Sequence, residues 1–161
     1  LVYGPPRRVM QTWSLKPAAI SAADASGHWE DGMTEIEPTG TLALQTIAMP
    51  ADTNANGDIF GGWLMAQMDL GTSVLARGRA RGRVATVAVR EMTFLRPVWV
   101  GDVISIHAEI IRLGTTSMTI DVEAWVHRQP ADERMKVAGA RFVFVAVDEV
   151  GRKRSLPEMA G

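Results

Sequence analysis

The feature that most constrains the fold is an alternation of apolar and polar residues along "SMTIDVEAWVHR", residues 117–128. Side chains of a β-strand point alternately to the two faces of a sheet, so this pattern predicts a strand with one face against a core. The same period of two occurs along residues 102–113. Four apolar residues there share one face: Ile104, Ile106, Ala108 and Ile110. A sheet with one apolar face is therefore expected.

One long segment ahead of these strands, residues 60–79, has a different period. Five of its residues recur on one stripe: Phe60, Leu64, Met68, Gly71 and Leu75. Three further apolar residues occupy other faces: Trp63, Leu70 and Val74. The spacing predicts a helix that is buried nearly all round. The basic run "RGRARGR" suits its C-terminal end, where the helix dipole is negative.

The order of these elements predicts the fold class. A strand at 41–50, closed by Pro50, precedes the helix, and four strand segments follow it: 84–95, 102–113, 117–128 and 136–148. An antiparallel sheet must wrap around a single helix in order to cover it, which gives an α+β domain. The last segment is apolar on both faces, as a central strand should be. One such sheet leaves an edge and a face uncovered, so we expect self-association.

The first forty residues differ from the rest because their Pro, Gly, Ala and Ser residues follow no sustained period. We expect three parts: an irregular extension at 1–40, one domain at 41–157 and a short tail at 158–161. The chain begins with Leu1, so Met33 is a plausible natural start. Trp13 and Trp29 favour the alternative that the extension docks on the domain.

Composition excludes several classes of function. The net charge of −1 gives no general attraction to nucleic acid or to an anionic membrane. Cysteine is absent, which rules out disulfides, thiolate nucleophiles and zinc–thiolate sites. No apolar run approaches the roughly 20 residues of a membrane helix, and no signal peptide is evident, so a soluble cytoplasmic protein is expected. His28, His107 and His127 lack zinc-site spacing, and we expect neither a metal nor a cofactor.

The chemistry is concentrated in "NANGDIFGGW", residues 54–63, at the predicted helix start. Free amides around Gly61 and Gly62 can donate to a carbonyl oxygen that gains negative charge. Asp58 can then act on a water or on the carbonyl carbon. Alternatively, Asp58 only caps the helix. Asn54 and Asn56 either form the turn or contact a ligand.

Asp69 is a second carboxylate, placed among mostly apolar residues of the predicted helix. A buried carboxylate needs a partner or a purpose. In an unbroken helix the segment from Asp58 to Asp69 spans roughly 16 Å, at about 1.5 Å per residue. The two acids can therefore converge on one carbonyl only if another subunit supplies the second. The alternative is a structural Asp69 with a satisfied carboxylate.

Three segments of the chain match a known family. The segments "MPADTNANGDIFGGWLMAQMDLG", "GRVATVAVREMTFLRPVWVGD" and "VAVDEVGRKRSLP" resemble bacterial acyl-CoA thioesterases of the hotdog superfamily, of the YciA type. The likeness covers roughly residues 41–157 and leaves the first thirty-odd residues without a counterpart. It implies a sheet wrapped around a helix, homodimers that build to hexamers as trimers of dimers, and hydrolysis of acyl-CoA to a free acid and CoA.

The resemblance also assigns residues. It makes Asp58 the catalytic carboxylate, gives Gly61 and Gly62 the amides that polarise the thioester carbonyl, and places Asp69 where related enzymes have an active-site acid at the dimer interface. Segments that line the CoA channel in the family supply four substrate-binding candidates: Arg96, Arg112, Thr116 and Ser117. The arginines would contact phosphate. Each of the four is alternatively a solvated surface or turn residue.

Two other functions remain open at this point. A non-catalytic acyl-CoA sensor is possible, although the extension offers no DNA-binding helix-turn-helix. A hotdog dehydratase or hydratase would need a histidine near the loop, and none of the three is close in sequence. The acyl-chain preference depends on packing that no motif encodes.

Overall fold

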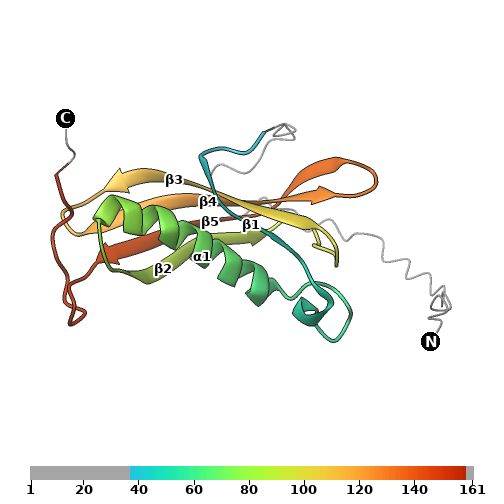
Figure 1. The fold of residues 1–161 in the computed structure, drawn as a ribbon, viewed down its shortest axis with the longest axis horizontal. Helices are drawn as coiled ribbons and strands as arrows, with labels where there is room; N and C mark the ends of the chain where they lie inside the picture. The colour runs from blue at the N-terminus through green and yellow to red at the C-terminus, as the bar shows by residue number, and fades with distance from the viewer. Residues whose placement is uncertain (1–36, 159–161) are drawn as a thin grey trace. The chain divides into compact units, whose positions relative to one another are not determined.

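The computed structural model describes residues 37–158 of the chain, so Trp13, Trp29 and His28 lie outside the described residues. The chain order is β1 (Thr41–Ile47), the short 3₁₀ helix η1 (Pro50–Asp52), α1 (Gly61–Ala80), β2 (Val84–Phe94), β3 (Val103–Leu113), β4 (Ser117–Arg128) and β5 (Glu133–Ala146) (Figure 1). Each predicted helix or strand is present within a few residues. The largest differences at one end are three residues: β1 ends three residues before the predicted end, and β5 begins three residues before the predicted start.

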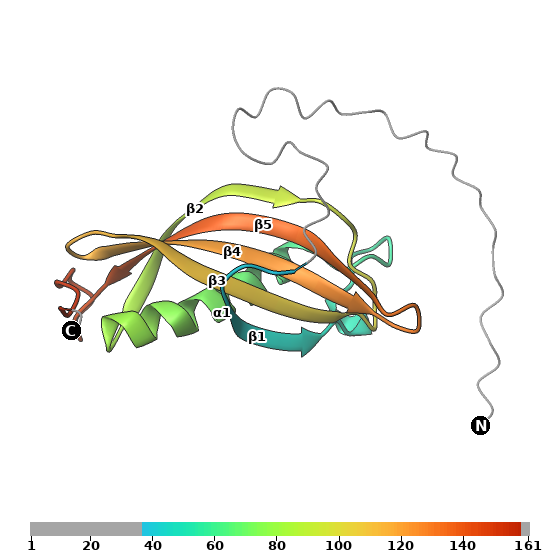
Figure 2. The same cartoon turned by 90° about the horizontal axis from the view of Figure 1, so that it is seen from above.

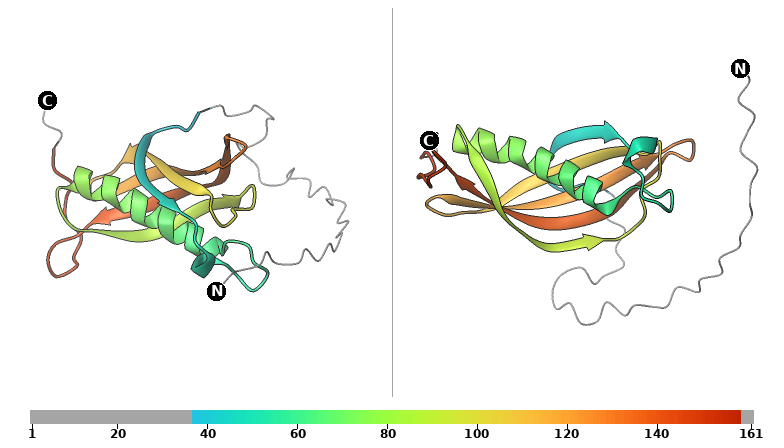
Figure 3. Two further views of the ribbon diagram at one scale, coloured as in Figure 1. Left: turned by 45° about the vertical axis from the view of Figure 1, so that its right-hand side comes forward. Right: turned by 90° about the horizontal axis from the view of Figure 1, so that it is seen from below.

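All five strands form one antiparallel sheet in the order β1-β3-β4-β5-β2. The hairpin from β3 to β4 is closed by the amide of Gly114, which donates to the carbonyl of Ser117 at 2.8 Å. The sheet curves around α1, which lies along one of its faces (Figures 2 and 3). The predicted class, an α+β fold with a sheet wrapped around one long helix, is confirmed.

The core lies between α1 and the concave face of the sheet. The residues predicted to alternate inward on β3 and β4 pack there, and Ile104, Ile106, Met118 and Ile120 are fully buried. The helix packs tightly on the sheet at Gly71. A Cβ atom at this position would lie 3.0 Å from Cγ2 of Ile106, so a larger residue would crowd the sheet here.

The prediction that α1 is buried nearly all round is wrong for a single chain. Leu70 and Val74 are 54% and 61% exposed, and Phe60, predicted on the buried stripe, is 58% exposed. The physical reason is that one sheet covers only one side of a helix. Strand β2 is the neighbouring sheet edge, and two of its apolar residues, Val87 and Val89, are exposed as well.

The C-terminal end of α1 matches the basic pattern of the sequence. Arg77 and Arg79 occupy the last turn, and Arg81 follows in the left-handed conformation with φ of 48°. Within residues 37–158, α1 is also the longest helix, and no helix combines the length and apolar character needed to cross a membrane.

Candidate active site

The loop before α1 is a compact turn built by Asn54. Its side-chain Oδ1 accepts the amides of Asn56 at 2.8 Å and Asp58 at 3.2 Å, and its own amide donates to the carbonyl of Asp58 at 2.7 Å. Gly57 has φ of +89°, a conformation that glycine adopts without strain. The side chain of Asn54 therefore shapes the turn that presents Asp58, and Asn56 contributes its backbone amide.

Near the start of α1, backbone amide donors and a carboxylate acceptor have no hydrogen-bond partner among residues 37–158. The N-cap residue is Phe60, whose side chain makes no capping bond, so Asp58 does not cap this helix. The first amides, of Gly61 and Gly62, have no acceptor among residues 37–158, whereas the amide of Trp63 bonds back to Phe60 at 2.9 Å. The carboxylate of Asp58 likewise accepts no hydrogen bond from the described residues. Among residues 37–158, a carboxylate without a partner thus stands three residues ahead of the first of two amides without an acceptor.

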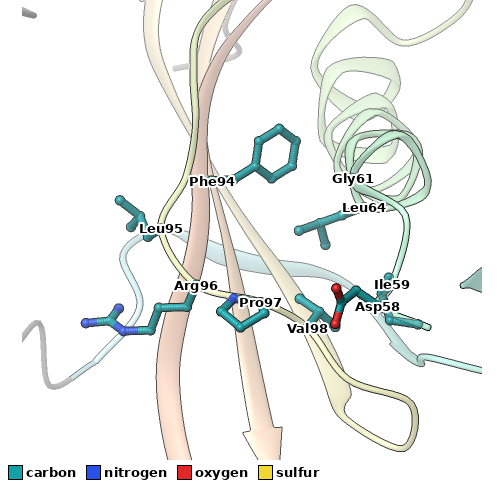
Figure 4. Close-up of a pocket in the computed structure, with 9 residues that line it drawn as sticks. All are labelled: Asp58, Ile59, Gly61, Leu64, Phe94, Leu95, Arg96, Pro97 and Val98. Carbon is teal, nitrogen blue, oxygen red and sulfur yellow. The ribbon is translucent and has the colours of Figure 1, made fainter. Parts of the chain in front are cut away.

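These groups border a cavity of about 370 Å³ (Figure 4). Its lining is Asp58, Ile59, Gly61, Leu64, Phe94, Leu95, Arg96, Pro97 and Val98. Figure 4 shows the carboxylate of Asp58 between Leu64 and Val98, with Phe94 across from Gly61. A Cβ atom on Gly61 would lie 3.3 Å from the Phe94 ring, so the helix start and the wall are already in contact. The cavity is mostly apolar, with one acid at its edge.

Arg96 lines the cavity, but its guanidinium reaches away from Asp58 (Figure 4). Its Nη1 donates to the carbonyl of Lys136 at 2.7 Å, and its backbone amide bonds to the carbonyl of Val137 at 3.4 Å. In this position the side chain fastens the cavity wall to β5.

A single chain does not bring Asp69 to this cavity. The carboxylate is half-buried on α1 and accepts a hydrogen bond of 2.7 Å from the hydroxyl of Thr86 on β2. Gly61 and Asp69 are eight residues apart on one continuous helix, which corresponds to about 12 Å along the axis. Asp69 therefore has a partner in its own chain and is remote from Asp58.

The candidates Arg112, Thr116 and Ser117 lie at the hairpin between β3 and β4. The carbonyl of Thr116 accepts the amide of Ala146 at 2.9 Å, which ties the hairpin to the end of β5. Figure 1 shows this hairpin beside the C-terminal end of α1, whereas the Asp58 loop lies at the other end of the helix. One chain alone does not join these residues to the cavity.

A polar cluster around Glu123 lies on the outer face of the sheet, and the sequence pattern did not predict it. Glu123 is only 7% exposed, and it accepts Lys136 Nζ at 2.9 Å, Trp125 Nε1 at 2.8 Å and the amide of Thr39 at 3.1 Å. Burial raises the pKa of Glu123, but these hydrogen bonds together outweigh it and leave the pKa below its ordinary value. The burial of neighbouring His107 lowers the pKa of its imidazole. The cluster faces away from α1 and the cavity.

A second missed feature supports the cavity wall. Asp102 is buried and forms an ion pair of 2.7 Å with Arg128 at the end of β4. The signal in the sequence was "GD" at the start of a strand, but nothing local pointed to a partner 26 residues away. As for metals, residues 37–158 contain no group of three or more His, Asp or Glu side chains arranged to hold an ion.

An antiparallel sheet wrapped around one long helix is the arrangement of the hotdog class of proteins. Comparison with known proteins is more specific. Residues 56–130 match the Thioesterase superfamily. The acyl-CoA thioester hydrolase YciA of Escherichia coli is 56% identical over 127 residues, which cover 77% of this chain and 96% of that protein.

Solved structures agree with this match. The hexameric broad-specificity acyl-coenzyme A thioesterase HI0827 has 50% identity and a TM-score of 0.73, covering 76% of this chain and 84% of that one. The hexameric thioesterase y2039 from Yersinia pestis has 53% identity and a TM-score of 0.73, covering 76% and 100%. The chain belongs to the hotdog-fold acyl-CoA thioesterase family of the YciA type. The resemblance inferred from the three motifs is confirmed.

Proposed function

We propose that this chain hydrolyses acyl-CoA to a free carboxylic acid and CoA at the cavity beside Asp58. One observation carries the proposal: a carboxylate without a hydrogen-bond partner among the described residues borders an apolar cavity that also contains the start of α1. Its YciA relative from Escherichia coli is named an acyl-CoA thioester hydrolase, which supports the same substrate class.

The amides of Gly61 and Gly62 polarise the thioester carbonyl. During attack the carbonyl oxygen gains negative charge, and backbone donors already aimed at it lower the barrier without reorganising. The positive end of the α1 dipole acts in the same direction. The apolar side chains of Leu64, Phe94 and Val98 hold the acyl chain away from water.

Asp58 supplies the attacking oxygen by one of two routes. As a general base it takes a proton from water, whose oxygen bonds to the carbonyl carbon. As a nucleophile its own oxygen bonds to that carbon, and water then cleaves the resulting anhydride. In both routes the C–S bond breaks and the sulfur leaves with the electron pair and takes up a proton to give the free thiol. Water supplies the net elements of hydrolysis, so no redox cofactor is needed.

A second copy of the chain completes the site in this proposal. The exposed apolar residues of α1 and the free edge of β2 form a surface on which a homodimer can close. The partner then brings its Asp69 and the CoA-binding candidates of its hairpin: Arg112, Thr116 and Ser117. Three dimers would form a hexamer, the state named for HI0827 and y2039. The absence of cysteine fits a place in the reducing cytoplasm.

The test is Asp58→Asn, which keeps the shape of the side chain and removes its charge. Release of free thiol from a panel of acyl-CoA esters should fall by at least about 100-fold while the fold stays intact. Asp52→Asn is the matched control, because the Asp52 carboxylate accepts the amide of Met49 and does not line the cavity. Near-normal turnover by Asp58→Asn would reject the mechanism. A wild-type chain that binds acyl-CoA without releasing thiol would be a sensor.

A further inference from the structure

The wall of the cavity is a segment that lies outside the strands of the sheet. Residues 95–102 connect β2 to β3, and these strands are separated in the sheet by β5 and β4. Four consecutive residues of the segment, Leu95 to Val98, line the cavity. Backbone hydrogen bonds fix its two ends, from Leu95 to the carbonyl of Val137 at 2.8 Å and from Gly101 to the carbonyl of Ala48 at 2.9 Å. Its middle needs other support.

A nearly buried ion pair supplies that support. The side chains of Asp102 and Arg128 are 3% and 13% exposed. Arg128 Nε donates to Asp102 Oδ1 at 2.9 Å and Nη2 donates to Oδ2 at 2.7 Å, so the ion pair is bidentate. The same Oδ2 accepts the amide of Trp99 at 2.8 Å, so the carboxylate also ties the segment to itself.

Arg128 contacts the segment at two further points. Its Nη2 donates to the carbonyl of Pro97 at 3.2 Å, and its guanidinium lies 3.6 Å from the centre of the Trp99 ring. The hydrogen bonds that Arg128 donates to Asp102 raise the pKa of Arg128, so its charge persists at every working pH. One face and one edge of the guanidinium are thereby occupied by protein, which leaves Arg128 unsuited to binding a substrate phosphate.

The wall is connected in turn to the reacting carboxylate. The carbonyl of Val98 accepts the amide of Ile59 at 3.3 Å, and Ile59 follows Asp58 directly in the chain. A shift of the segment would therefore move both the apolar wall and the loop that presents Asp58. We propose that Arg128 and Asp102 are positioning residues, whose ion pair sets the distance between Asp58 and the thioester. This inference rests on the proposed function.

The experiment compares Arg128→Lys and Arg128→Met with Arg141→Lys. Lysine at position 128 keeps the positive charge but cannot make the bidentate pair with Asp102. Methionine removes the charge. Arg141 is the matched control, because its Nε donates to Asp121 at 2.7 Å on β4 while its ion pairs involve no residue of the segment. We would measure kcat and KM for an acyl-CoA that the wild type hydrolyses, and amide hydrogen exchange of peptides spanning 54–60 and 95–102.

The kcat should fall about tenfold for Arg128→Lys and up to about 100-fold for Arg128→Met, since small displacements of a reacting group carry costs of this order. KM should change far less, because the lost interaction acts on the reacting geometry. Exchange should accelerate in both peptides for the Arg128 variants and stay unchanged for Arg141→Lys. If Arg128→Met does not fold, Arg128→Lys decides alone.

A merely structural ion pair would lower the melting temperature and leave kcat of the folded Arg128 variants unchanged. That result would overturn the proposal. If the wild type itself releases no thiol, the proposed function fails, and the hydrogen-exchange data alone then test whether Arg128 holds residues 54–60 and 95–102 in place. Unchanged exchange in the Arg128 variants would refute this positioning role.

Discussion

Two glycines of α1 allow a direct test of how closely the helix packs on the sheet. At Gly71 a Cβ atom would lie 3.0 Å from Cγ2 of Ile106 and 3.2 Å from Cβ of Leu44. At Gly78, on the same helix, a Cβ atom would meet nothing within 4 Å. The two substitutions Gly71→Ala and Gly78→Ala are thus chemically identical and differ in the space available.

The two substitutions should have different effects on the free energy of unfolding. Alanine gains about 1 kcal/mol over glycine in a helix interior, so Gly78→Ala should raise the free energy of unfolding by about that amount. Gly71→Ala gains the same term but pushes against Ile106, which is fully buried, and overpacking of this kind costs about 1–3 kcal/mol. The net effect at Gly71 should lie between neutral and a loss of about 2 kcal/mol, from these two terms. The difference between the variants isolates the crowding.

Urea unfolding monitored by circular dichroism measures both values. All variants must be compared at one protein concentration, because subunit association adds to apparent stability. The m-value should not change, since neither substitution alters the surface exposed on unfolding. If Gly71→Ala proved as stable as Gly78→Ala, the close approach of helix and sheet would not constrain this position, and the reasoning would be refuted.

Three further predictions concern pH, the extension and the shared site. Burial lowers the pKa of His107, so the unfolded chain takes up a proton at this residue before the folded chain does, and the free energy of unfolding should fall as the pH drops below about 6.5. Urea unfolding of His107→Gln should show a flatter decline between about pH 7.5 and 5.5. An unchanged slope would contradict the assignment of this decline to His107. A chain that begins at Met33 should fold and hydrolyse acyl-CoA normally, and loss of soluble or active protein would indicate that the extension docks on the domain. Mixed dimers that pair one Asp58→Asn chain with one Asp69→Asn chain should regain up to about half the wild-type activity in a thiol-release assay, because one of their two sites carries neither substitution. Verified mixed dimers without activity would exclude a site shared between subunits.

Much of the fold was predictable because the apolar periodicity of a strand or a helix depends only on residues close together in the sequence. The alternation at Ile104 and Ile106 depends only on the pleat of a strand, and the structure buries both. That Asp58 and Gly61 lie together was also predictable, since they are three residues apart in sequence, and both line one cavity; their catalytic roles stay predictions.

The remainder depends on contacts that no local pattern encodes. Leu70 and Val74 are apolar, yet sequence periodicity cannot say whether an apolar residue faces its own sheet or another surface. The outer-face cluster around Glu123 forms because separate strands converge there. The phosphate-binding role of Arg96 stays a prediction, but no sequence pattern indicated that its guanidinium would donate to the carbonyl of Lys136.

The cavity is divided between two stretches of the gene with different freedom to change. Residues 58–64 carry the acid and the amides, whereas residues 94–98 supply most of the apolar surface. In the proposed mechanism, a mutation in the second stretch that changes only the size of an apolar side chain resizes the space for an acyl group, while the backbone hydrogen bond from Ile59 to Val98 still positions Asp58. After gene duplication, descendants of this protein could thus diverge in the length of acid they release while inheriting the same chemistry. Selection for a new substrate would leave its record around Phe94 and Val98, and selection for turnover around Asp58.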